Sequence, residues 1–177
     1  MSDASSIFKS KYSIYTSTLN KTSYDDQNDI HLCQNTTQLV YDFDAIVKDK
    51  YPSKQPASPD ALLVDKETIY CIEFKNEQYA KINREQIKKK VIDGKEVIQS
   101  IFTENNINIS HYKFIFCVAY KANQGKYKQE RYKRFGKKPI QFGLRHFIGS
   151  AFNEIQTNDI QFFIHEYKKR FKKKLIC

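Results

Sequence analysis

The pattern of apolar and polar residues predicts a β-sheet with helices packed against it. The clearest strand is 112–120, which is apolar at nearly every position and is therefore expected at the centre of a sheet. Two shorter strands, 61–64 and 68–75, are joined by a tight polar turn, which predicts a β-hairpin. A last strand is expected over 160–167.

Apolar residues at helical spacing predict helices before and after this hairpin. One helix is expected over 37–50, ending at Tyr51-Pro52. A long helix is expected over 77–104, with Gly94 as a point of interruption or kinking, and a weaker one over 142–155. This order of elements is typical of an α/β fold with a mixed central sheet flanked by helices.

The chain is expected to form a single domain over residues 1–177, because it shows neither an internal repeat nor a linker. Residues 1–21 lack a pattern and predict a loose N-terminal arm or a peripheral helix. Residues 121–139 are expected to form a basic loop, and 168–177 a basic tail.

Apolar runs and cysteines bear on the cellular setting. The longest apolar run, 114–120, is much shorter than the roughly 20 residues of a membrane-spanning helix, and the N-terminus shows no secretory signal. The four cysteines have neither zinc-ligand spacing nor the pattern of a disulfide scaffold. The sequence therefore predicts no membrane partner, reduced thiols, and an intracellular location in the cytoplasm or nucleus.

Charge is distributed unevenly along the chain. Residues 22–79 hold 5 Lys and no Arg against 11 Asp and Glu, a net charge of −6. Residues 80–177 hold 22 Lys and Arg against 8 Asp and Glu, a net charge of +14. This asymmetry favours a polyanion-binding face beside a cluster of carboxylates.

The predicted hairpin brings charged residues together. Glu73 and Lys75 project from the same face of their strand, and the hairpin folds Asp60 back toward them. Two carboxylates at one point suit Mg²⁺ or Mn²⁺, which prefer oxygen ligands. A lysine beside them can orient a water molecule or stabilise charge on a phosphate. These residue types are therefore suited to phosphodiester hydrolysis.

The pattern Pro59-Asp60 followed by Glu73-x-Lys75 resembles the PD-(D/E)xK nuclease superfamily. The resemblance implies a restriction-endonuclease-like α-β-β-β-α-β core, although no first strand can be placed before Pro59. It also implies that Asp60, Glu73 and the Phe74 carbonyl ligate metal and that Lys75 serves the nucleophilic water. A surface Glu–Lys pair beside a Pro-Asp turn is the alternative explanation of the same residues.

Further ligands are left open by the sequence. Many members of the superfamily add a glutamine from the helix after the motif, for which Gln86 is the candidate, and a carboxylate from the first helix. Asp42 and Asp44 both suit the second role, and Asp44 is the one carried forward as a metal ligand. The order of His31, Asp44, Asp60, Glu73 and Lys75 is also similar to that in viral cap-snatching endonucleases, which use a histidine.

The predicted basic loop is the candidate nucleic-acid interface. It interleaves eight Lys and Arg with aromatic residues, and these can neutralise phosphates and stack on bases. The expected contacts are Lys121, Lys126, Tyr127, Lys128, Arg131, Tyr132, Lys133, Arg134, Lys137 and Lys138. A basic tail of this kind is often only a solvated charge run.

The sequence predicts an Mg²⁺- or Mn²⁺-dependent nuclease, with DNA favoured over RNA as the substrate. An inactive nucleic-acid-binding accessory module of the same fold is the alternative. A basic protein–protein adaptor is a third reading of the charge. A homodimer or a larger complex is compatible with all of these.

Overall fold

Six strands form one mixed sheet in the computed structural model, which describes residues 3–122, 140–172, 175 and 177. The strand order is β1-β4-β5-β6-β7-β8, in which the first four strands pair antiparallel and β7 and β8 are added in parallel. Their bounds are β1 Thr16–Thr18, β4 Leu39–Asp42, β5 Ala61–Asp65, β6 Thr68–Lys75, β7 Lys113–Tyr120 and β8 Glu154–Asp159. A separate hairpin consists of β2 (Tyr24–Asp25) and β3 (Ile30–His31).

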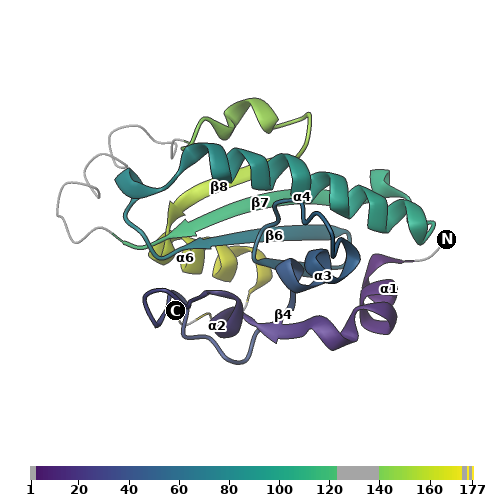
Figure 1. The fold of residues 1–177 in the computed structure, drawn as a ribbon, viewed down its shortest axis with the longest axis horizontal. Helices are drawn as coiled ribbons and strands as arrows, with labels where there is room; N and C mark the ends of the chain where they lie inside the picture. The colour runs from purple at the N-terminus through teal and green to yellow at the C-terminus, as the bar shows by residue number, and fades with distance from the viewer. Residues whose placement is uncertain (1–2, 123–139, 173–174, 176) are drawn as a thin grey trace.

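Helices cover both faces of the sheet (Figure 1). Side chains of α1, α3 and α4 share one apolar cluster, and α6 packs into the cluster on the opposite face. The α-helices are α1 Ala4–Lys11, α2 Leu19–Thr22, α3 Phe43–Lys50, α4 Arg84–Glu104 and α6 Ile160–Phe171. Short 3₁₀ turns are η1 Ser13–Tyr15, η2 Tyr79–Lys81, η3 Ile109–His111 and η4 Leu144–Phe147. The expected α/β class, with a mixed central sheet flanked by helices, is confirmed.

Strand β6 follows the alternation that its sequence predicts. Tyr70, Ile72 and Phe74 belong to the cluster on the α6 side of the sheet. Ile69 and Cys71 belong to the cluster on the α4 side, and Glu73 continues the series on that face. The charged end of β6 therefore lies under α4.

The expectation of one helix over 37–50 is wrong in its first residues. Leu39–Asp42 is strand β4, whose backbone pairs with both β1 and β5. Asp42 then caps α3, because its side chain accepts a hydrogen bond from the Ala45 amide at 2.9 Å. An apolar series that fits a helix is thus divided between an internal strand and a shorter helix.

The C-terminal elements also differ from expectation. The predicted strand 160–167 is helix α6, which Asp159 caps, and the first part of the predicted basic tail is the last turn of that helix. In place of a helix over 142–155 the chain forms η4 and then enters β8. β8 escapes hydropathy because its buried side chains are polar: Gln156 accepts from the Tyr70 hydroxyl, and Thr157 accepts from the Gln141 amide.

The N-terminal residues are packed rather than loose, which corrects the expectation of an arm. Ala4 and Phe8 of α1 are fully buried against the α4-side cluster, and Leu19 is buried on the other face. Strand β1 adds an edge to the sheet. The alternative of a peripheral helix holds for α1, although that helix contributes to the core.

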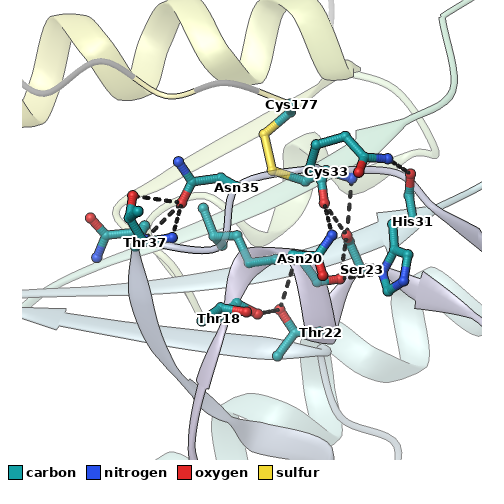
Figure 2. Close-up of a disulfide and its surroundings, with 12 residues drawn as sticks. Thr18, Asn20, Thr22, Ser23, His31, Cys33, Asn35, Thr37 and Cys177 are labelled. Atoms are coloured by element: carbon teal, nitrogen blue, oxygen red, sulfur yellow. Dashed lines mark hydrogen bonds between the residues drawn. A yellow bond between two sulfur atoms is a disulfide. The ribbon is translucent and has the colours of Figure 1, made fainter.

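A disulfide joins Cys33 to Cys177, which corrects the expectation that all four cysteines are thiols (Figure 2). Cys33 is fully buried, and its backbone is held by Asn20 and Ser23. Cys71 and Cys117 are buried free thiols, as expected. The argument from cysteine usage to a reducing compartment therefore no longer applies. Within the described ranges, no helix is both long and apolar enough to cross a membrane.

Candidate metal centre and nucleic-acid interface

The β5–β6 hairpin places Asp60 beside the charged end of β6. Ala61 pairs with Ile72, so the residue before β5 reaches the level of Glu73 and Phe74. The Asp60 Oδ2 atom accepts a hydrogen bond of 2.6 Å from the Phe74 amide. The proximity expected from the hairpin is therefore present, and a backbone donor fixes the carboxylate.

A residue that the sequence analysis missed connects the two carboxylates. The Nζ atom of Lys90, on α4, lies 3.2 Å from Asp60 Oδ1 and 2.7 Å from Glu73 Oε2. Lys75 Nζ lies 3.1 Å from the other oxygen of Glu73, Oε1. Two ammonium groups and two carboxylates thus form one compact network.

The electrostatics of this network centre on Glu73, whose side chain is fully buried. Burial raises the pKa of Glu73 to about 7, and the nearby Asp60 charge raises it further while Lys90 and Lys75 oppose the shift. Burial alone would lower the pKa of Lys90, but the two carboxylates outweigh it and raise that pKa. A buried carboxylate without its cations would cost several kcal/mol.

Helix α4 reaches the carboxylates because Gly94 packs against the Pro-Asp turn. A Cβ atom at Gly94 would lie 2.7 Å from Cδ of Pro59, closer than real Cβ contacts. Gly94 neither interrupts nor ends the helix, which runs unbroken through it. The glycine therefore serves close packing, and Lys90 lies about one turn earlier on the same helix.

Gln86 joins the site through Lys75. Its Oε1 atom accepts a hydrogen bond of 3.3 Å from Lys75 Nζ. Gln86, Lys75 and Asp60 also line a cavity of about 330 Å³ whose other wall includes Asp25 and Asp26, around β2. The Asp25 side chain accepts a hydrogen bond of 3.4 Å from Asn76, which follows β6. Solvent therefore has a route to the edge of the network.

The remaining candidate ligands make other contacts. Asp44 accepts hydrogen bonds from Ser58 at 2.7 Å and Gln55 at 3.2 Å. Burial raises the pKa of Asp42, with smaller contributions from Asp44 and Asp60, so Asp42 lies within electrostatic range of the site. The His31 Nδ1 atom lies 2.8 Å from the Asn20 carbonyl. Neither Asp44 nor His31 is brought to Lys90 by these contacts.

The donors suit a divalent cation, although they do not form a large cluster. Within residues 3–122, 140–172, 175 and 177, no group of three or more His, Cys, Asp or Glu residues could hold a metal ion. Mg²⁺ commonly uses one or two carboxylates together with water and substrate phosphates. Asp60 and Glu73 fit that requirement, and the buried Glu73 Oε1 has no partner with hydrogen-bond geometry among the described atoms, despite the nearby Lys75.

The candidate nucleic-acid interface begins beside this network. The Lys121 amide donates a hydrogen bond of 2.9 Å to the Lys75 carbonyl, and the Lys121 side chain is exposed. The other expected contacts, from Lys126 to Lys138, lie outside the described residues. The basic segment therefore leaves the sheet next to the carboxylates.

Comparison of the chain with protein-family models, with curated proteins and with solved structures finds no match in any of the three.

Proposed function

We propose that this protein is a metal-dependent nuclease that hydrolyses phosphodiester bonds, with DNA favoured over RNA. The observation that carries the proposal is the meeting of Asp60 and Glu73 at one cationic position, with Lys75 beside Glu73. These are the residues of the motif that resembles the PD-(D/E)xK superfamily. They lie at the end of a hairpin and beside a polar cavity, as a site for a phosphate substrate requires.

The order of elements supports the same proposal. β4 provides a strand before Pro59, which the sequence pattern alone did not place. From α1 the chain continues through three antiparallel strands, β4, β5 and β6, then crosses over α4 to the parallel strand β7. With α3 as an insertion, this order agrees with a restriction-endonuclease-like α-β-β-β-α-β core.

Each residue of the network has a role in this proposal. Asp60 and Glu73 would hold Mg²⁺ or Mn²⁺, which when bound supplies positive charge at the phosphate undergoing attack. Lys75 would orient the attacking water or stabilise the negative charge that develops on the phosphate. Gln86 holds the Lys75 ammonium toward the cavity. The basic segment after Lys121 would bind the nucleic-acid backbone.

Cleavage assays test the proposal directly. Labelled single- and double-stranded DNA and RNA should be incubated with Mg²⁺, Mn²⁺ or EDTA, and cleavage should require the metal. Asp60→Ala should abolish cleavage, whereas Asp65→Ala, an exposed change at the other end of β5, should not. Intact substrates in all four cases with millimolar Mn²⁺ would contradict the proposal.

An inactive accessory module is the second candidate, and the position of Lys90 favours it. The Lys90 ammonium already supplies a positive charge between the two carboxylates. Lys75→Ala separates the candidates: in an enzyme it should lower cleavage by about 10²-fold and leave binding nearly intact. Lys81→Ala, which removes an exposed charge near the same cavity edge, is the control.

A further inference from the structure

The Lys90 ammonium occupies the place between Asp60 and Glu73 where a shared cation would lie. It is within 3.2 Å of Asp60 Oδ1 and within 2.7 Å of Glu73 Oε2. The remaining Asp60 oxygen, Oδ2, accepts from the Phe74 amide. The two oxygens turned toward each other across the site are therefore the two that contact Lys90.

A metal ion and this ammonium group cannot share those oxygens. Mg²⁺ lies about 2.0–2.1 Å from its oxygen ligands, so it would have to enter the space between the carboxylates. A divalent ion and an ammonium group in contact also repel each other strongly where water is largely excluded. The Lys90 side chain is 15% exposed, and its four-carbon stem allows the ammonium group to move away.

We propose that Lys90 is the resident cation of this carboxylate pair, and that a divalent metal ion binds between Asp60 and Glu73 only by displacing the Lys90 ammonium group. The inference rests on the proposed function, because it concerns the metal position of the same site. It makes Lys90 a competitor that sets the metal affinity of the protein.

Metal affinity in a matched pair of variants tests this exchange. Binding of Mn²⁺ alone should be followed by electron paramagnetic resonance in wild type, Lys90→Met and Lys89→Met. Lys89 is the adjacent, exposed lysine of α4, so its variant loses the same charge away from the carboxylates. Lys90→Met should bind Mn²⁺ at least about tenfold more tightly than wild type, and Lys89→Met should bind with nearly wild-type affinity.

A measurement on wild type covers the case in which Lys90→Met does not fold. Acetylation of individual lysines by acetic anhydride should be quantified by mass spectrometry with and without Mn²⁺. Displacement frees the Lys90 ammonium, so acetylation of Lys90 should increase with Mn²⁺ while that of Lys89 stays constant.

The outcomes separate this inference from the proposed function. Equal Mn²⁺ affinities with unchanged Lys90 acetylation overturn the inference, and metal-dependent cleavage by the same protein would leave the nuclease proposal intact. Tight Mn²⁺ binding by Lys90→Met alone, with neither binding nor cleavage by wild type, supports the competition and contradicts the nuclease proposal. Absence of Mn²⁺ binding in both proteins overturns both.

Discussion

Glu73 is the residue on which the electrostatics of the site depend. It lies on a strand face that is apolar up to Cys71, under a helix, and its side chain is fully buried. Burial favours the neutral acid, whereas Lys90 and Lys75 favour the carboxylate. The balance raises the pKa of Glu73 to about 7, within the range where many proteins operate.

The raised pKa of Glu73 predicts a pH dependence of stability in metal-free buffer. The folded state holds the proton more tightly than the unfolded chain, whose Glu73 has the ordinary pKa of 4.5. The free energy of unfolding should therefore fall as the pH rises from about 4.5 to about 7, by up to about 1.4 kcal/mol per pH unit. Urea unfolding at several pH values should show this decrease in wild type.

Glu73→Gln should remove that part of the pH dependence, because an amide does not titrate. Glu85→Gln is the matched control, since Glu85 is an exposed residue of α4 paired with Lys88. Parallel pH profiles for wild type and Glu73→Gln would contradict the assignment of the raised pKa to Glu73.

Helix α4 and the hairpin form the two halves of the site. α4 supplies Lys90 and Gln86, and the hairpin supplies Asp60, Glu73 and Lys75. The Asn83 side chain caps the helix by accepting from two backbone amides of its first turn. The distance between the halves is set where the helix crosses Pro59.

Gly94→Ala should destabilise the protein, although alanine is the better helix former. Alanine would gain roughly 0.5–1 kcal/mol from helix propensity. Its Cβ would lie 2.7 Å from a rigid proline ring, and overpacking of this kind costs about 1–3 kcal/mol. Urea unfolding should therefore show a lower free energy of unfolding.

Lys89→Ala, an exposed change on the same helix, is the control for that experiment and should have little effect. A Gly94→Ala protein more stable than wild type would show that α4 does not need its close approach to the Pro-Asp turn.

The whole molecule is closed by the disulfide between Cys33 and Cys177, which are 144 residues apart in sequence. Figure 2 shows the bond beside the hydrogen-bonded segment around Asn20 and Ser23. That segment continues into β2, and Asp25 and Asp26 line the cavity beside the site. The disulfide thus fastens the chain that borders one wall of the cavity.

Reduction of the disulfide should lower the free energy of unfolding by about 2–5 kcal/mol, because the reduced unfolded chain has far more conformations available. Urea unfolding with and without dithiothreitol measures this difference. The Cys177→Ser protein should already have the lower stability and should not respond to dithiothreitol. An equal response to dithiothreitol in that variant would show that the stabilisation does not come from this bond.

The sequence by itself determined the elements whose patterns are local. The β5–β6 hairpin, β7 and most of α4 follow from strand alternation and helical spacing, and the hairpin alone indicated that Asp60 approaches Glu73. Such patterns are informative because period 2 and period 3.6 place side chains on a face without reference to the rest of the chain.

Tertiary structure decided the rest, through contacts between distant residues. β4 is a strand because it lies between β1 and β5, and β8 is a strand because its buried polar side chains find partners such as Tyr70 and Gln141. Lys90 is one lysine in a run of three, and nothing in that run marks which one faces the carboxylates. Only the packing of Gly94 on Pro59 determines that its ammonium lies between Asp60 and Glu73, because side-chain direction there follows from how the helix crosses the sheet.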